Sequence, residues 1–324
     1  MTSAAPLAPL YPPSQPYDCT ELAVSSGHRL HVEQWGTATG IPALVLHGGP
    51  GSGCTPAMAR FFDPERYRVI LLDQRGAGRS QPHGCREDNT TALLLDDLET
   101  LRRYLAVDRW LLLGGSWGGT LGVLAAAANP AGTAGLLLRN PFLARQQDVT
   151  WFFEGARPFH ADAWRHWQVL GVPEQAGAME PWLEQRLTTG DDAERSALAL
   201  AWWHWENALA GTTETATPPA TDTLPRLANK YQLQLHYFRQ GCFLDTDAVL
   251  RAATRLGNIP TLILQGRQDH VCPGSETEQL HRALPNSRLQ WIDGVGHDPY
   301  APAMADATVR ALDHYASTGT FITP

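Results

Sequence analysis

Short apolar runs alternate with longer amphipathic segments along most of the chain. Runs of four to eight apolar residues are typical of buried strands, and strands that alternate with helices form a parallel sheet. The pattern therefore predicts an α/β fold with a mostly parallel central sheet flanked by helices. The apolar runs occupy residues 43–46, 68–72, 110–113, 135–139, 261–264 and 288–292, and segments with helical spacing lie at 90–105, 120–128 and 275–284.

The middle of the chain departs from this alternation. Between residues 141 and 245 the strand-like runs vanish, and tryptophan and histidine become dense. Residues 191–209 have helical spacing, and residues 211–223, rich in Gly, Thr and Pro, have the composition of an exposed loop. We therefore expect a core domain made of residues 1–140 and 246–324, with residues 141–245 inserted as a helical cap.

Composition narrows the class of protein. The chain has 324 residues, of which 43% are hydrophobic, and this is enough for a large core with an inserted subdomain. Its net charge of −8, with no basic cluster, argues against nucleic-acid binding. No apolar run approaches the roughly 18 residues that a membrane span needs, and the N-terminus does not have the pattern of a signal peptide. The composition is silent on oligomeric state.

The cysteines and potential metal ligands point to a cytoplasmic protein without a metal. Five scattered cysteines fit reduced thiols better than a disulfide framework. No cysteine or histidine spacing typical of a metal site occurs, so we expect no metal.

Residues 114–118, Gly-Gly-Ser-Trp-Gly, lie between the strand predicted at 110–113 and the helix predicted at 120–128. A G-x-S-x-G motif in this context is a nucleophile elbow, in which small glycines permit a sharp turn that projects the serine hydroxyl. The alternative is a glycine-rich turn with a solvated serine. The flanking strand and helix favour the elbow, so a hydrolase with Ser116 as nucleophile is the first hypothesis.

A serine nucleophile needs a general base, and the base needs an orienting acid. In hydrolases built on such an elbow the acid and then the histidine follow the serine in the sequence. Asp269 follows the strand predicted at 261–264, and His297, between small residues, follows the one at 288–292. Catalytic groups gather at the carboxyl ends of parallel strands. The predicted triad is therefore Ser116, Asp269 and His297.

Two alternatives to this acid stay open. Asp269 could instead cap a helix that starts near Pro273. Asp293 is a rival acid, although it lies on the same loop as His297 rather than on the preceding one.

Residues 47–51, His-Gly-Gly-Pro-Gly, directly follow the first apolar run. Glycines let a backbone N–H approach a reacting oxygen closely, so this loop is a candidate oxyanion hole together with the N–H of Trp117. We expect Gly49 rather than Gly48 to be the donor, and His47 to be structural.

Together these motifs resemble the proline iminopeptidase family of the α/β-hydrolase fold, whose members are serine exopeptidases that release N-terminal proline. The resemblance covers nearly the whole chain, and HGGPG, DQRGxGxS and GGSWG in this order are specific. It implies a helical cap over the triad, a small peptide substrate and no cofactor, because acyl transfer needs only water. The matching segments are residues 10–13, 47–51, 62–64, 73–80, 89–91, 114–118, 202–206, 236–238, 266–269 and 272–273.

The resemblance also implies a substrate site. In the family, carboxylates on the cap hold the free α-amino group of the substrate, because an ammonium taken out of water must meet negative charge. The matching positions here are Glu206 and Glu154, and Phe142 and Phe153 would line an apolar pocket for the proline ring.

One position departs from the family pattern. The family carries a glutamate two residues before His-Tyr-Phe, where this chain has Gln234. An amide keeps the size but loses the charge, and a charge-assisted hydrogen bond contributes about 1.5–3 kcal/mol, or roughly ten- to a hundredfold in affinity. An esterase or amidase of the same fold that acts on a small or secondary-metabolite substrate is therefore the alternative function.

Other classes fit less well. A non-catalytic binding protein on this scaffold normally has a damaged triad, and all three members are present here. Dehalogenase and epoxide hydrolase chemistry needs a carboxylate where Ser116 stands. Cys272, three residues after Asp269, is expected either to lie near the site and confer sensitivity to thiol reagents or to be a buried small hydrophobe.

Overall fold

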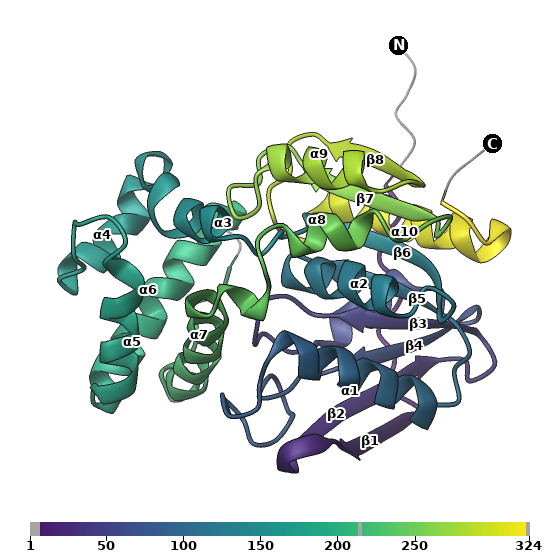
Figure 1. Cartoon of the computed structure of the whole chain (residues 1–324), viewed down its shortest axis with the longest axis horizontal. Helices are drawn as coiled ribbons and strands as arrows, with labels where there is room; N and C mark the ends of the chain where they lie inside the picture. Colours follow the sequence, from purple (N-terminus) through teal and green to yellow (C-terminus); the bar gives the residue numbers. More distant parts are fainter. Residues whose placement is uncertain (1–6, 213–215, 322–324) are drawn as a thin grey trace.

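The computed structural model describes residues 7–212 and 216–321. Its core is an eight-stranded sheet with the strand order β1-β2-β4-β3-β5-β6-β7-β8 (Figure 1). The β1–β2 and β2–β4 pairs are antiparallel, and all the other neighbouring strands are parallel. The strands are β1 (Asp18–Ala23), β2 (Arg29–Gly36), β3 (Ile41–Leu46), β4 (Tyr67–Leu72), β5 (Trp110–Gly115), β6 (Thr133–Arg139), β7 (Thr261–Gly266) and β8 (Ser287–Ile292).

The apolar runs form the parallel part of the sheet, as predicted. Leu111, Leu112 and Leu113 of β5 are fully buried, because helices cover both faces of a parallel sheet and leave no solvated side. The α/β-hydrolase arrangement with a mostly parallel sheet is thereby confirmed. The sequence analysis missed β1 and β2, in which buried residues such as Leu30 and Val32 alternate with polar ones.

Two helical layers cover the sheet. The buried side chains form one apolar cluster on each face, and the larger one continues into the helices between β6 and β7. One face carries α1 (Thr91–Tyr104), α2 (Trp117–Ala128), α8 (Ala248–Ala253) and α9 (Gly274–Ala283), and the other carries α10 (Pro302–Thr318) (Figure 1).

Residues between β6 and α8 form a separate group of helices beside the sheet (Figure 1). The longest is α6, where the Asp191 carboxylate caps the N-terminus by accepting from the Glu194 N–H, and Gly211 ends the helix at φ 74°. The prediction of a helix at 191–209 is confirmed. Of the loop predicted at 211–223, residues 213–215 lie outside the described residues. The helices are α3 (Gln146–Thr150), α4 (Ala161–Val169), α5 (Met179–Thr189), α6 (Asp192–Ala210) and α7 (Leu224–Arg239).

Helix length and hydropathy bear on membrane insertion. Within residues 7–212 and 216–321, no helix combines the length and the hydrophobicity needed to cross a bilayer.

Candidate active site

A cavity of about 460 Å³ lies between the carboxyl ends of the central strands and the helices α6 and α7. This volume is in the range of small-molecule sites and exceeds what one amino-acid side chain fills. The sheet side contributes Gly48, Gly49, Ser116, Arg139, Cys272 and His297, and the helical side contributes Phe152, Glu206, Lys230, Gln234 and Phe238.

Ser116 occupies a strained turn between β5 and α2. Its φ of 54° and ψ of −124° are sparsely populated for a residue with a side chain. A Cβ at Gly118 would lie 1.9 Å from the Leu46 carbonyl oxygen, and one at Gly114 would lie 2.2 Å from the Gly118 oxygen. Only glycine fits at these two positions, because of close contacts within the turn and with Leu46 of β3, and the glycines allow the sharp turn that presents the serine to the cavity.

Asp269 and His297 are brought together from the loops after β7 and β8. His297 Nδ1 lies 2.6 Å from Asp269 Oδ2. The other carboxylate oxygen accepts from the N–H groups of Val271 (2.8 Å) and Cys272 (2.9 Å). Asp269 is 4% exposed, so little water competes with the imidazole for its carboxylate. The carboxylate accepts the proton on His297 Nδ1, which leaves Nε2 as the basic nitrogen.

The structure disfavours both alternatives to this acid. The N-cap position of α9 is Pro273, not Asp269. Asp293 is exposed and forms an ion pair with Arg267 at 2.6 Å.

The Ser116 hydroxyl has a sulfur neighbour. Ser116 Oγ lies 3.9 Å from Cys272 Sγ, and within the described chain no hydrogen bond joins it to His297. Cys272 is 3% exposed, so it is both buried and adjacent to the serine. Burial, and after it the Asp269 charge, raises the pKa of the Cys272 thiol well above its usual value, so the thiol is neutral near pH 7.

Thiol modification tests this proximity. We expect N-ethylmaleimide to inactivate the enzyme by filling the cavity at Cys272. Because the thiolate reacts and the pKa of this thiol is raised, the rate should rise about tenfold per pH unit between about pH 7 and 9. Cys272→Ser should retain activity and resist the reagent, whereas Cys19→Ser, at an exposed cysteine, should stay sensitive. Inactivation of Cys272→Ser at the wild-type rate would contradict the assignment.

Three free backbone N–H groups lie in the segments next to Ser116. Those of Gly48, Gly49 and Trp117 donate to no backbone or side-chain acceptor in the described residues. Gly49 has φ 112°, a conformation that favours glycine. Gly48 is close as well, since a Cβ there would lie 3.5 Å from Ser116 Cβ. The loop after β3 and the start of α2 can therefore both supply donors to an oxygen that bears negative charge.

A buried glutamine, which the sequence analysis did not single out, ties these two segments together. The Gln74 N–H donates to His47 Nε2 and its side-chain amide donates to the His47 carbonyl, both at 3.0 Å. Trp117 Nε1 donates to Gln74 Oε1 at 3.0 Å. Burial lowers the pKa of His47, so the ring is neutral and its Nε2 can accept. This explains His47 as a structural residue that orients the glycine loop.

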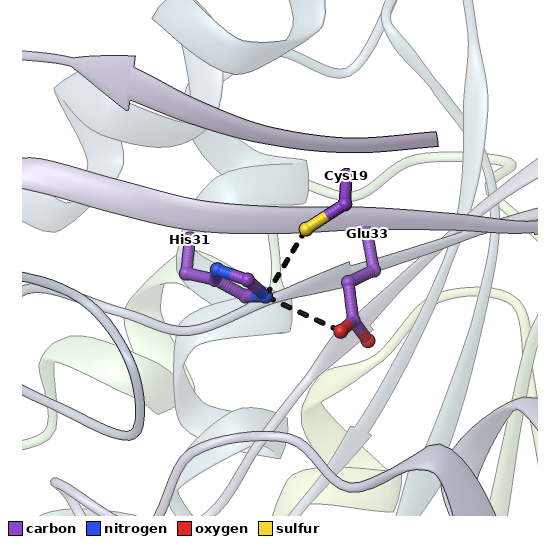
Figure 2. Close-up of side chains that lie close together, drawn as sticks. All are labelled: Cys19, His31 and Glu33. Carbon is purple, nitrogen blue, oxygen red and sulfur yellow. Dashed lines mark hydrogen bonds and ion pairs between the residues drawn. The ribbon is translucent and has the colours of Figure 1, made fainter. Parts of the chain in front are cut away.

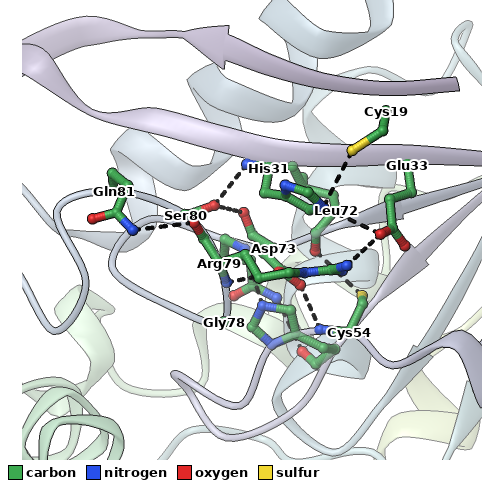
Figure 3. Close-up of polar contacts among 12 residues, drawn as sticks. Cys19, His31, Glu33, Cys54, Leu72, Asp73, Gly78, Arg79, Ser80 and Gln81 are labelled. Atoms are coloured by element: carbon green, nitrogen blue, oxygen red, sulfur yellow. Dashed lines mark hydrogen bonds and ion pairs between the residues drawn. The ribbon is translucent and has the colours of Figure 1, made fainter. Parts of the chain in front are cut away.

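The loop that carries Gln74 is anchored by charge (Figure 3). Asp73 accepts from the Cys54 N–H at 2.6 Å and from Arg79 Nε at 2.9 Å. Arg79 Nη1 also donates to Glu33 on β2. Asp73 and Arg79 belong to the DQRGAGRS motif at residues 73–80. The sequence analysis matched this motif to a family but assigned it no structural role.

A thiol, an imidazole and a carboxylate meet beside this network (Figure 2). His31 Nε2 lies 3.7 Å from Cys19 Sγ and 3.2 Å from Glu33 Oε1. These three are a possible metal-ligand set among the described residues. However, the Arg79 guanidinium is already bonded to the same Glu33 oxygen and repels a second cation, so we assign the cluster to the support of the loop.

Glu206 and Gln234, both predicted as substrate ligands, contact each other. Gln234 Nε2 donates to Glu206 Oε1 at 3.0 Å, and Gln234 Oε1 is buried without a partner in the described residues. The second Glu206 oxygen accepts from Lys230 Nζ at 3.0 Å and from the Tyr231 hydroxyl at 2.9 Å. The sequence analysis did not predict Lys230 at this site. Its positive charge offsets the negative charge of Glu206.

Two residues predicted to bind substrate do not line the cavity. Phe153 packs edge-on against Trp202, with ring centroids 5.2 Å apart. Glu154 does not line the cavity either, and its Oε1 accepts from the Gly177 N–H at 2.6 Å. Both residues belong to a π-helical turn over Trp151–Gly155, of which Phe152 lines the cavity instead. Phe142 lines the cavity as predicted, together with Phe238.

The sheet order, the serine elbow after β5 and the aspartate–histidine pair after β7 and β8 define an α/β-hydrolase. The family model described as the alpha/beta hydrolase fold matches residues 42–302. A crystal structure of VinJ superposes with a TM-score of 0.65 at 23% identity and covers 94% of this chain and 99% of its own. A proline iminopeptidase structure from Mycobacterium smegmatis gives a TM-score of 0.62 at 20% identity, covering 93% of this chain and 98% of its own.

Relatives with higher sequence identity identify the family within this fold. The chain is 42% identical over 311 residues to a proline iminopeptidase of Xanthomonas citri, with 95% of this chain and 99% of the relative covered. It is 41% identical over 309 residues to that of Xylella fastidiosa, with 94% and 99% covered. It therefore belongs to the proline iminopeptidase family and is a hydrolase of this type. The resemblance noted from the sequence motifs is confirmed.

Proposed function

We propose that the protein is a serine exopeptidase that releases an N-terminal residue, preferably proline, from small peptides through an acyl-enzyme on Ser116. The observation that carries this proposal is the position of His297. It lines the same cavity as the strained Ser116, and its Nδ1 lies 2.6 Å from Oδ2 of the buried Asp269.

In the first step His297 Nε2 takes the proton of Ser116 as the serine oxygen attacks the carbonyl carbon of the substrate. For this the hydroxyl turns from Cys272 to His297, an adjustment common when substrate binds. The N–H groups of Gly49 and Trp117 stabilise the negative oxygen. His297 then gives its proton to the leaving amine, which departs. Water, deprotonated by His297, finally hydrolyses the ester on Ser116 and restores the hydroxyl.

The helical segment supplies the substrate pocket in this proposal. We treat residues 141–245 as a cap domain inserted between the core segments 1–140 and 246–324. Phe142, Phe152 and Phe238 form an apolar wall suited to a pyrrolidine ring. Glu206 would receive the α-ammonium, with Gln234 as an uncharged second acceptor.

The Lys230–Glu206 ion pair favours a second candidate, an esterase or amidase of the same fold. The two side chains are only 21% and 23% exposed, and their charges cancel. A substrate ammonium must share the Glu206 carboxylate with the Lys230 ammonium, which repels it, whereas an uncharged acyl group meets no such repulsion. Together with Gln234, this makes the polar end of the cavity less selective for a free amine.

Paired initial rates separate the two functions. The substrates are a prolyl arylamide, its N-acetylated form, an alanyl arylamide and a short-chain p-nitrophenyl ester. Rapid cleavage of the free prolyl compound with the acetylated form inert supports the exopeptidase. Cleavage of the ester with both prolyl compounds inert supports the second candidate.

Lys230→Met is expected to increase kcat/KM for the free prolyl arylamide by about ten- to a hundredfold, the worth of one charge-assisted hydrogen bond. The reason is that the substrate ammonium no longer competes with the Lys230 ammonium for the Glu206 carboxylate. Lys230→Arg keeps the charge and should show no gain. Gln234→Glu should raise the ratio of free-amine to N-blocked hydrolysis in the same direction. If neither Lys230→Met nor Gln234→Glu changes that ratio, these positions do not control amine recognition.

We also propose a cytoplasmic location. All five cysteines are free in the structure, which suits a reducing compartment.

A further inference from the structure

Arg139, at the carboxyl end of β6, is a buried cation without an acceptor among residues 7–212 and 216–321. It is 6% exposed, and it lines the same cavity as Ser116. Its Nε and Nη1 atoms are fully buried, and no guanidinium nitrogen donates a hydrogen bond within the described residues. The guanidinium lies over the Phe61 ring, whose centroid is 4.6 Å from Cζ. Buried guanidinium groups are normally paired with acceptors, so this one has donors to offer.

The surroundings of Arg139 do not neutralise it. Asp298 and Tyr300 are the groups that act on its charge, and neither forms a hydrogen bond or ion pair with it in the described part of the chain. The Asp298 carboxylate instead accepts from the Tyr300 N–H at 2.9 Å. Burial lowers the pKa of Arg139 to about 10, so the side chain still carries its charge at neutral pH.

Arg139 lies next to the reacting serine. Its carbonyl accepts from the Ser116 N–H at 3.0 Å, and its Nε would be 3.9 Å from a Cβ built on Gly115. The residues that act on its charge, Asp298 and Tyr300, follow His297 directly in the sequence. His297 hands a proton to the departing group, and Arg139 lines the sheet side of the cavity together with Ser116 and His297, whereas Glu206 and Lys230 line it from α6 and α7.

We propose that Arg139 binds the carboxylate of the leaving group, so that the preferred substrates are dipeptides whose second residue has a free α-carboxylate. This inference rests on the proposed exopeptidase function and names its substrate class. In such a leaving group the carboxylate carbon is two bonds from the scissile nitrogen, so it stays close to Ser116. A planar guanidinium matches a carboxylate with two parallel hydrogen bonds.

The test compares prolyl-alanine with prolyl-alaninamide, which differ only in the C-terminal charge, in wild type, Arg139→Met and Arg139→Lys. A prolyl arylamide, whose leaving group has no carboxylate, reports the triad in each variant. We expect wild type to favour the acid over the amide by about ten- to a hundredfold in kcat/KM. Arg139→Met should abolish this preference while it keeps arylamide turnover, and Arg139→Lys should retain part of it.

Other outcomes overturn the proposal. An equal rate on acid and amide in wild type would do so, and so would an unchanged ratio in Arg139→Met, which would leave Arg139 as a packing partner of Phe61. If Arg139→Met does not fold, the wild-type ratio and Arg139→Lys still decide. If wild type cleaves no prolyl substrate, the proposed exopeptidase function fails instead. Acetoxyacetate and acetoxyacetamide then provide the same comparison of leaving groups on esters.

Discussion

Replacing Ser116 by alanine is expected to abolish turnover, with a loss of about 10⁴- to 10⁶-fold in kcat, because no other group can form the acyl-enzyme. The fold should persist. The only hydrogen-bonding partner of the hydroxyl within the described residues is Cys272 Sγ at 3.9 Å, and alanine tolerates the same backbone angles about as well as serine does.

The measurement is the initial rate on the fastest of the four substrates, together with circular dichroism and the Tm. Ser275→Ala is the matched control, since Ser275 lies in the first turn of α9 and does not line the cavity. A folded Ser116→Ala variant with activity near that of the control would overturn the assignment of the nucleophile and, with it, the mechanism.

Asp269→Asn is expected to lower kcat by about 10⁴-fold. The carboxamide keeps the size of the side chain but can present its NH₂ group to His297 Nδ1. The imidazole then carries its proton on Nε2, and this nitrogen can no longer accept the proton of Ser116. The Val271 and Cys272 N–H groups still find the amide oxygen, so the loop after β7 should stay in place.

Asp293→Asn is the matched control, because the one ion pair of that exposed carboxylate in the described part of the chain is with Arg267, and the carboxylate should be dispensable. Both variants are assayed on the same ester and amide substrates, so that a substrate-specific effect can be recognised. A large loss in Asp293→Asn with little loss in Asp269→Asn would show that the rival acid orients the histidine.

The two errors in the substrate site come from helix geometry. A residue's direction in a helix depends on the number of residues per turn, and a π-turn over Trp151–Gly155 widens the local winding. Motif matching placed Phe153 and Glu154 at the substrate, but in this winding Phe152 reaches the cavity. A one-position shift of this kind leaves no signal in composition or periodicity.

The strands missed at the N-terminal edge have a different cause. β1 is exposed at every second position, and β2 is antiparallel to both of its neighbours. Their residues alternate between apolar and polar over a short length and are therefore weaker signals than the continuous apolar runs of the parallel strands.

The sequence by itself determined the α/β-hydrolase fold, the family and the serine elbow. The apolar runs can only be buried in a covered sheet, and the glycines at 114 and 118 are demanded by backbone contacts within the turn and to the neighbouring strand. Tertiary structure decided which charges meet in the cavity. Glu206 of α6 is paired with Lys230 of α7, and Arg139 of β6 is left without an acceptor, because these side chains meet only when elements distant in sequence pack together.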